Sequence, residues 1–369
     1  MLAVADCRSI HTLRWARRLV DRGHELHIVS NRVGARPEDV AGMHVYDIRK
    51  LDALTRIPGL RRHRWGAAIR NLAERVQADV IHGHGITPYA YWAALSGFHP
   101  LVVSPWGRDV LVDAKKEPGR TRALRAMAAA DHFVVNSAAI AQAAIAVGAD
   151  AGRMLNVMWH TQLAGFGPDR ADPRRLRAEL GLPDDSLIVM SLRNFQQRTN
   201  IDVLVRAFAR VQADLPRARL VLAARAGEAR AEVEAVVDEL ELRPLVRFHR
   251  VEPEGLPTLA ASGDVVVSIA ATDSSPSSLL EAMVSGRPLV AGWCPSIDEW
   301  LGPGEGAEMV ECRDEDALVA ALLKLLRDPE LRRLYGERNQ RLVRERVSES
   351  GPALEALYRD LVERHRAAA

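Results

Sequence analysis

Short apolar runs alternate with amphipathic helical stretches along the whole chain, and this alternation restricts the fold more than any other feature. A first apolar run, LAVADC (2–7), is followed by a helical stretch that ends at Gly23, and then by a second run, ELHIVS (25–30). Apolar runs of this length are typical of strands buried on both faces, with the intervening helices as the crossovers of a parallel sheet. The sequence therefore predicts an α/β protein.

The alternation occurs twice, on either side of a turn-rich stretch, GFGPDRADP (165–173), which is the expected linker. A chain of 369 residues is long for one core and suits two. We therefore expect two Rossmann-like parallel-sheet domains, residues 1–165 and 166–351. The further expected strands are 43–48, 78–85, 100–104, 132–136 and 154–159 in the first half and 187–192, 219–224, 245–249, 264–270, 288–291 and 307–310 in the second.

Composition narrows the class of protein. Hydrophobic residues make up 48% of the chain, which suits two packed cores, and no apolar run approaches the length of a membrane-spanning helix. The start, MLAVAD, is strand-like rather than a charged and then apolar leader, so we expect a cytoplasmic protein. Cys7, Cys294 and Cys312 are far apart and lack metal-ligand spacing, which indicates neither a disulfide framework nor zinc.

Charge is distributed unevenly along the chain. Residues 1–165 contain 22 Lys and Arg against 14 Asp and Glu, whereas the remainder has an acidic surplus. A basic N-terminal half suits an anionic substrate, an anionic membrane surface, or solubility alone. We expect no nucleic-acid partner.

A basic amphipathic stretch, RIPGLRRHRWGAAIRNLAERV (56–76), lies within this half. It is compatible with a helix that lies on anionic lipid, which would place the protein peripherally at a membrane. The alternative, which we favour, is a helix whose stripe of Trp65, Ile69, Leu72 and Val76 packs in the core and whose basic face is solvated.

The most informative stretch covers residues 273–299, directly after an apolar run, and most of it reads SSLLEAMVSGRPLVAGWCPSIDE (277–299). Asp273 comes at the carboxyl end of an expected strand, Ser275 and Pro276 suit the start of a helix, and Glu281 lies inside that helix. In an open α/β sheet ligands bind at this edge, where a helix N-terminus attracts phosphate. The alternative is an ordinary strand-turn-helix with two solvated acids.

This stretch resembles the donor-site signature of the family-4 retaining glycosyltransferases (glycosyl transferases group 1), "EGxPxxLLEAMAxGxPVVA". Asp273 replaces the first Glu and Ser274 the following Gly, whereas the second Glu, the LLEAM core, the Gly-x-Pro and the later Glu299 are in place. The resemblance implies the GT-B fold, in which two Rossmann-like domains face a central cleft. It also implies that the last helix, 352–366, packs back on the first domain.

The resemblance assigns roles to three acids. It implies that Glu281 accepts both ribose hydroxyls of a nucleotide, and that Glu299 supports the nucleotide pocket. It further implies that Asp273 orients the sugar hydroxyls and is catalytic.

The sugar donors of this family are nucleoside diphosphate sugars, and cations or backbone amides are needed to bind the diphosphate. The segment SLRNFQQRTNIDVLVRAF (191–208) resembles the family's "GRLxxxKGxDxLLxAF", so Arg193 and Arg198 are expected to neutralise it, with one extra residue before Asp202. Arg193 is also expected to be catalytic. Backbone amides at the start of the helix after Asp273 are the other expected donor contacts, namely those of Ser275, Ser277, Ser278 and Leu279.

The opening of the chain resembles a family variant, "D..S.H...W...L...GHE", that lacks the usual Gly-Gly loop after the first strand. The backbone contact that this loop makes with the diphosphate is therefore in doubt here. His11 is a candidate to face the cleft instead and to take part in catalysis. The alternative is a surface histidine near the start of a helix.

The expected acceptor half departs further from the family. In VSPWGRD (103–109), Trp106 stands where the family has a cleft His in "xxxHGxD", and Asp109 is retained. We expect that His82 or His84 takes the role of that His, or that no residue does. His-Gly-His offers no third ligand, so no metal is expected.

The family's "PNGVD" is replaced by MWHTQLAGF (158–166), with His160 in place of its Gly. We therefore expect acceptor recognition to have diverged, with weak candidates in His82, His84, Trp106, Asp109 and His160.

The resemblance implies a retaining glycosyltransferase that needs neither metal nor cofactor. It would move a sugar from a nucleotide donor, most simply a UDP-sugar, to a small-molecule, saccharide or lipid-linked acceptor by front-face attack, forming an α-glycoside. The alternatives are an epimerase or hydrolase that acts on sugar nucleotides, or a two-lobed sugar-binding protein.

Overall fold

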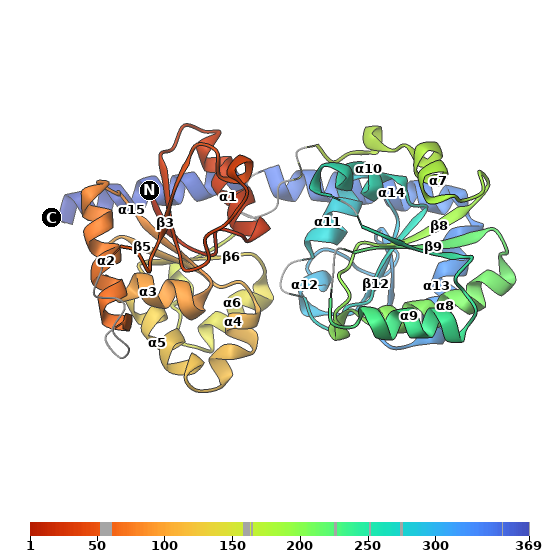
Figure 1. The fold of residues 1–369 in the computed structure, drawn as a ribbon, viewed down its shortest axis with the longest axis horizontal. Coiled ribbons are helices and arrows are strands. Elements are labelled where there is room, and N and C mark those ends of the chain that lie inside the picture. The colour runs from red at the N-terminus through yellow and green to blue at the C-terminus, as the bar shows by residue number, and fades with distance from the viewer. Residues whose placement is uncertain are drawn as a thin grey trace. The chain divides into compact units, whose positions relative to one another are not determined.

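The computed structural model describes the chain apart from residues 52–60, 158–162, 164, 225–226, 251, 274–275, 349 and 369. The chain forms two compact units (Figure 1). Unit 1 comprises Met1–Gln162 and Val347–Ala369, and unit 2 comprises Leu163–Arg346. The boundary thus falls between 162 and 163 rather than between 165 and 166, and the turn-rich stretch 165–173 belongs to unit 2.

Unit 1 is built on a parallel sheet with the described strand order β3-β2-β1-β4-β5-β6-β7. Its strands are β1 (Leu2–Val4), β2 (Leu26–Ser30), β3 (Met43–Asp47), β4 (Ile81–His84), β5 (Leu101–Ser104), β6 (His132–Val135) and β7 (Met154–Asn156). Its described helices are α1 (Ile10–Val20), α2 (Arg61–Arg75), α3 (Tyr91–Ala94), α4 (Arg108–Leu111), α5 (Gly119–Ala129), α6 (Ala138–Ile145) and α15 (Ser350–Ala368). Strands and helices alternate as the sequence predicts.

Unit 2 repeats this architecture around a second parallel sheet, with the described order β10-β9-β8-β11-β12-β13. Its strands are β8 (Leu187–Ser191), β9 (Ala218–Ala223), β10 (Val246–His249), β11 (Val265–Ser268), β12 (Leu289–Gly292) and β13 (Ala307–Val310). Its described helices are α7 (Pro173–Leu180), α8 (Ile201–Asp214), α9 (Arg230–Glu239), α10 (Leu256–Ser262), α11 (Ser277–Val284), α12 (Pro295–Asp298), α13 (Glu315–Arg327) and most of α14 (Pro329–Ser348). The prediction of two parallel α/β sheets is confirmed.

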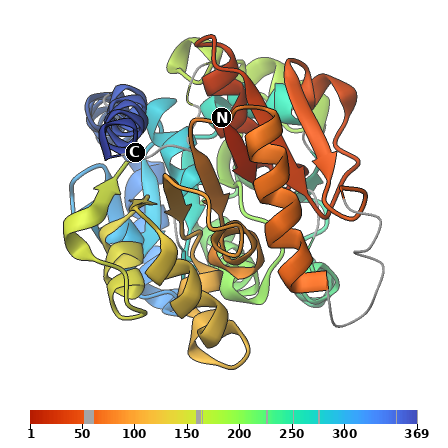
Figure 2. The same ribbon diagram turned by 90° about the vertical axis from the view of Figure 1, so that its left-hand side faces the viewer.

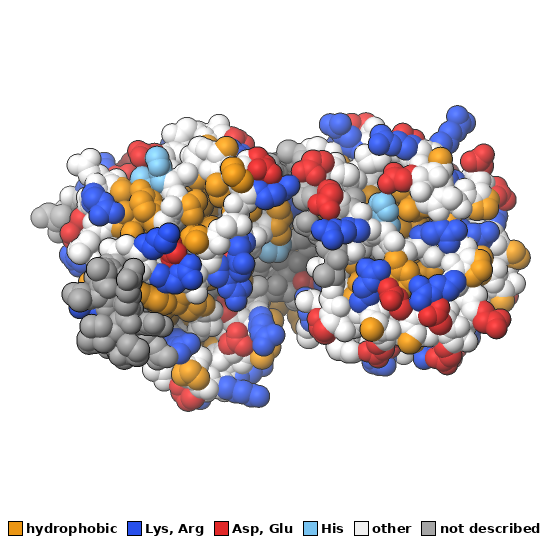
Figure 3. All heavy atoms as spheres, viewed as in Figure 1, with side chains coloured by type: hydrophobic (Ala, Val, Ile, Leu, Met, Phe, Trp, Pro, Cys, Tyr) orange, Lys and Arg blue, Asp and Glu red, His pale blue; other side chains and the backbone are white. Residues whose placement is uncertain are grey.

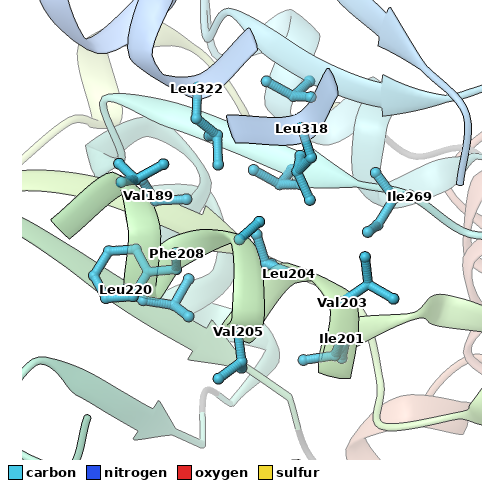
Figure 4. Close-up of a cluster of buried hydrophobic side chains, with 14 of the residues drawn as sticks. Val189, Ile201, Val203, Leu204, Val205, Phe208, Leu220, Ile269, Leu318 and Leu322 are labelled. Carbon is cyan, nitrogen blue, oxygen red and sulfur yellow. The ribbon is translucent and has the colours of Figure 1, made fainter. Parts of the chain in front are cut away.

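Successive side chains of a strand enter different cores because they point to opposite faces of the sheet. In unit 1, Leu2 and Val4 pack against the helices of one face, whereas Ala3 packs with α1 and α15 on the other. Figure 2 shows helices along both sides of this sheet. In unit 2, α8, α9 and α13 cover one face, and Figure 4 shows the side chains of α8, such as Leu204 and Phe208, gathered with those of strands and α13.

The apolar stripe of α2 is used inside unit 1. Ile69 and Leu72 are fully buried in its core, and Trp65 and Val76 are partly buried against the same cluster. Residues 56–60 of the predicted amphipathic stretch lie outside the described residues. The described part of the stretch therefore has its hydrophobic side against the sheet, as in the second of the two expectations. None of the described helices is long and apolar enough to cross a bilayer.

The closing helix α15 completes unit 1. Leu354, Tyr358 and Leu361 are buried in the core that α1 also covers, and residues 352–366 lie within this helix. The Tyr358 hydroxyl is 2.7 Å from Nδ1 of His82, whose Nε2 is 2.7 Å from the Ser104 hydroxyl. Because His82 is fully buried, desolvation lowers its pKa to about 3. Residues from β4, β5 and α15 are thus joined around one neutral imidazole.

This burial predicts a pH-dependent stability. The folded protein resists protonation of His82 down to about pH 3, whereas the unfolded chain binds a proton below about pH 6.5. Stability is therefore lost as the pH falls below about 6.5, at up to about 1.4 kcal/mol per pH unit for this group. Urea unfolding should show that wild type loses about 1 kcal/mol more between pH 7 and 5.5 than His82→Gln does. Equal losses in the two proteins would contradict this account of His82.

Candidate active site

Two loops meet at the carboxyl edge of the sheet of unit 2. They follow β8 and β11, which are adjacent parallel strands paired through Val189 and Val265. Arg193, in the first loop, places Nη1 2.7 Å from Oδ2 of Asp273 in the second. The two side chains are only 11% and 7% exposed. The prediction that both residues belong to one site is consistent with this ion pair.

Further contacts between the same loops continue the pairing of the strands. Asn200 donates Nδ2–H to the Ile269 carbonyl at 2.8 Å, and the Ala271 amide donates to the Arg198 carbonyl at 2.8 Å. Arg198 Nη1 donates in turn to the Thr272 carbonyl at 2.9 Å. We call this set of contacts, from Asn200–Ile269 to Arg193–Asp273, the loop seam.

Two guanidinium groups, those of Arg193 and Arg198, lie on one side of the loop seam. Burial lowers the pKa of Arg198, the positive charge of Arg193 lowers it further, and Asp273 opposes the change. Arg193 is nearly buried and Arg198 is exposed, and two cations near each other create a region that favours anions, since an anion relieves their repulsion. That Arg193 and Arg198 neutralise a phosphate stays a prediction.

The start of α11 contributes polar groups to the same edge. Ser278 accepts a hydrogen bond from Arg193 Nη1 at 3.2 Å, and Leu279 is buried. The helix begins at Ser277 with Pro276 directly before it, whereas the sequence predicts Pro276 inside the first turn. Ser275 lies outside the described residues. The amides of the first turn have no partners within the helix, as at any helix N-terminus.

Two acids follow along the chain. Glu281 lies in α11 and is 4% exposed, which is rare for a carboxylate in a surface helix. Glu299 is half-buried directly after α12, and its carbonyl accepts a hydrogen bond from Arg346. Burial distinguishes Glu281 from an ordinary solvated acid.

Aromatic rings gather at the carboxyl edge of the sheet of unit 1. Trp106 lies after β5, and its ring is 5.9 Å from that of His11 and 5.8 Å from that of His84, edge-on in both cases. The buried His84 ring also lies 4.2 Å from that of Trp15. The structure thus brings three predicted residues, His11, His84 and Trp106, into one cluster.

Two other candidates of unit 1 have different surroundings. His82, expected near the acceptor, is fully buried with both ring nitrogens at hydrogen-bonding distance of Tyr358 and Ser104. Asp109 is also buried, and its carboxylate accepts hydrogen bonds from four backbone amides, those of Ile86, Trp106, Gly107 and Val110. Burial raises the pKa of Asp109, and the amides oppose that rise. Both side chains therefore hold loops and strands together rather than face a ligand. His160 lies outside the described residues.

Asn200 and Arg313 also lie at this edge and were not predicted from the sequence. Arg313 follows β13, donates from Nη1 to Oδ1 of Asn200 at 3.2 Å, and comes within 3.8 Å of Asp202. One signal in the sequence could have indicated Asn200. The family motif "KGxD" has Gly two residues before its Asp, whereas this chain has Asn200 two residues before Asp202. Among the described residues, no three His, Cys, Asp or Glu side chains form a group that could hold a metal ion.

Comparison with known proteins covers both halves of the chain. The family described as "Glycosyl transferases group 1" matches residues 172–342, and "Glycosyl transferase 4-like" matches residues 1–137. The lipopolysaccharide core biosynthesis glycosyltransferase LpsD of Rhizobium meliloti is 30% identical over 202 residues, which are 55% of this chain and 57% of that protein. The match therefore spans little more than half of LpsD.

Two further similarities extend over nearly the whole chain. The N-acetyl-alpha-D-glucosaminyl L-malate synthase of Bacillus anthracis is 22% identical over 363 residues, which are 94% of this chain and 92% of that protein. The structure of Anabaena HepE in complex with UDP and glucose has a TM-score of 0.80 at 18% identity and covers 98% of this chain and 99% of its own. Its likeness supports the GT-B fold. The two family matches, one in each α/β unit, show that the chain belongs to the group 1 glycosyltransferases.

Proposed function

We propose that the protein is a retaining glycosyltransferase that uses a nucleoside diphosphate sugar, most simply a UDP-sugar, and forms an α-glycoside. The observation that carries the proposal is the loop seam, where Arg193, Arg198 and Asp273 lie at the edge of the sheet beside the start of α11. Its residues fall within the segment that matches the group 1 family.

Each part of a donor has a counterpart at this edge. Arg193 and Arg198 offer guanidinium donors to the diphosphate, and the amides of 277–279 add the N-terminus of α11. The carboxylate of Glu281 suits the two ribose hydroxyls, because its two oxygens can each accept one hydrogen bond. Asp273 is bound to Arg193, so it both holds that cation and offers acceptors to the sugar.

Resemblance and chemistry support the proposed nucleotide and stereochemistry. Anabaena HepE was solved with UDP and glucose, which supports UDP as the first nucleotide to test. A negative charge that grows on the leaving diphosphate is stabilised by two fixed arginines without a metal ion. The same diphosphate, held on the face from which the sugar leaves, can take the proton of the acceptor, so the new bond forms with retention.

The acceptor is proposed to carry negative charge. Residues 1–165 have the positive surplus, and Figure 3 shows Lys and Arg predominating on the visible face of unit 1 while both signs are mixed on unit 2. The name of the Bacillus anthracis relative specifies L-malate, a dicarboxylate. A lipid-linked or saccharide acceptor with anionic groups meets the same requirement, and such a lipid would bring the protein to a membrane surface.

Nucleotide binding tests the donor site. We expect one nucleoside diphosphate, UDP first among UDP, GDP, ADP and TDP, to raise the melting temperature, because a ligand at 100 times its Kd adds about 2.7 kcal/mol. Glu281→Ala should abolish that rise, whereas Glu337→Ala, on the exposed side of α14, should preserve it. If the nucleotide raises the melting temperature of Glu281→Ala as much as that of wild type, Glu281 does not hold the nucleotide.

Turnover tests Asp273. Asp273→Asn keeps the size of the side chain but removes the charge that holds Arg193, so we expect kcat to fall about 10- to 100-fold. Nucleotide affinity should change less, because Arg193 and Arg198 remain. The rate at which nucleoside diphosphate is released at saturating donor gives kcat for both the wild type and the variant. An unchanged kcat would assign Asp273 a structural role only.

Ionic strength tests the acceptor. If unit 1 attracts an anionic acceptor, KM for L-malate or a sugar phosphate should rise as salt is added, because salt screens exposed charges. KM for an uncharged analogue should stay constant. The alternatives are separated by the same assay: an epimerase or hydrolase consumes the donor without any acceptor, and a binding protein releases no nucleotide.

A further inference from the structure

The conformation of Asn200 is unusual for a residue with a side chain. Its φ of 50° and ψ of 40° lie in the left-handed region, directly before the first residue of α8. Glycine adopts this conformation at least cost, and the family motif has Gly at the equivalent place. Asn adopts it more readily than most other residues with a side chain, and here it ends the short 3-10 helix Gln197–Thr199. The purpose of the Asn200 side chain is shown by its contacts.

That purpose is not to cap α8, because the Asn200 side chain makes no capping hydrogen bond. It is 3% exposed and spans two other loops instead. Nδ2 donates to the Ile269 carbonyl at 2.8 Å, and Oδ1 accepts from Arg313 Nη1 at 3.2 Å. One amide thus connects the loops that follow β8, β11 and β13.

The bond to Ile269 lies where the loop seam begins. Ile269 is the first residue after β11, and Figure 4 shows its side chain pointing toward Val203 of α8. Asn200 therefore fixes the backbone of the second loop just where the ladder between the strands stops. Beyond this point the contacts of Arg198 and Arg193 follow in order, up to Asp273.

The two cations of the site lie in the loop that Asn200 holds at its end. The positive charge of Arg193 lowers the pKa of Arg198, Asp273 and Glu228 oppose that change, and Asp273 forms an ion pair with Arg193 across the loop seam. Without the bond at the base, fewer contacts would hold the Arg193–Arg198 loop on the Asp273 loop. A diphosphate would then have to fix this loop itself, at the expense of its own affinity.

We propose that Asn200 is a positioning residue, which holds the Arg193–Arg198 loop on the Asp273 loop so that the donor meets a preformed site. The proposal rests on the proposed function, since it assumes that this edge binds a nucleoside diphosphate. In this proposal, the Asn that stands where the family motif has Gly increases the affinity for the donor. Arg313, whose side chain is 69% exposed, orients the Asn200 amide from the outside.

The test is Asn200→Gly, which keeps the left-handed backbone and removes only the side chain. We expect the Kd for UDP and KM for the donor to rise about tenfold, because the Ile269 carbonyl loses its partner and the loops are no longer held. KM for the acceptor should not change. Hydrogen exchange of the Ala271 amide, which donates to the Arg198 carbonyl, should become faster relative to the amides of β12.

Asn339→Ala is the matched control. Asn339 is also fully buried in unit 2, and its Nδ2 donates to the carbonyls of Arg287 and Gly306, at 2.9 and 2.8 Å. This variant should lower the melting temperature and leave the Kd for UDP unchanged. If Asn200→Gly does not fold, Arg313→Ala replaces it and should raise the Kd for UDP in the same direction by a smaller factor.

The outcomes separate the two proposals. If wild type binds none of the four nucleoside diphosphates, the proposed donor site is wrong and the role of Asn200 with it. Suppose instead that wild type binds UDP. If Asn200→Gly, or Arg313→Ala used in its place, then binds UDP as tightly as wild type, only the positioning role is overturned. A loss of affinity that Asn339→Ala shares in equal measure would also overturn it, since the effect would then follow general stability.

Discussion

The ion pair between Arg193 and Asp273 is the interaction on which the arrangement of the site depends. Both groups are nearly removed from water, so each loses hydration that only a close, hydrogen-bonded partner can replace. Removing one member of such a pair typically costs about 3 to 5 kcal/mol, because the other charge is left buried alone. The two loops that carry the pair are therefore held in one mutual arrangement, and Ser278 extends it to α11.

The two sheets use their carboxyl edges in different ways. The edge of unit 2 has charged and amide groups, and these suit a strongly polar ligand. The described edge of unit 1 has indole and imidazole rings in edge-on contact, with His11 and Trp106 near the surface and His84 beneath. Rings of this kind recognise shape and apolar faces as well as hydrogen bonds. The same sheet topology thus supports two kinds of recognition, since parallel strands leave the loops at their ends free to differ.

Much of the fold could be predicted because burial on both faces leaves a long apolar run in the sequence. β5, β8 and β13 were expected within one or two residues of their observed bounds. Arg193 and Glu281 could be found because they lie in segments whose spacing follows a family pattern. His82 and Asp109 could not be interpreted correctly, because whether a polar side chain at a strand end faces solvent or another backbone depends on distant residues. For His82 the deciding residue is Tyr358, 276 positions away. Asn200 was missed because its role depends on a left-handed backbone and on a carbonyl in another loop.

The return of α15 to unit 1 has a consequence for biosynthesis. Unit 2 is continuous in sequence and is inserted between the two parts of unit 1. On the ribosome, unit 2 can therefore be complete while unit 1 still lacks Leu354, Tyr358 and Leu361 from its core. Until then, a face of the first sheet that α1 alone cannot cover is open to water and to chaperones. The half that is translated first is thus the half that finishes folding last.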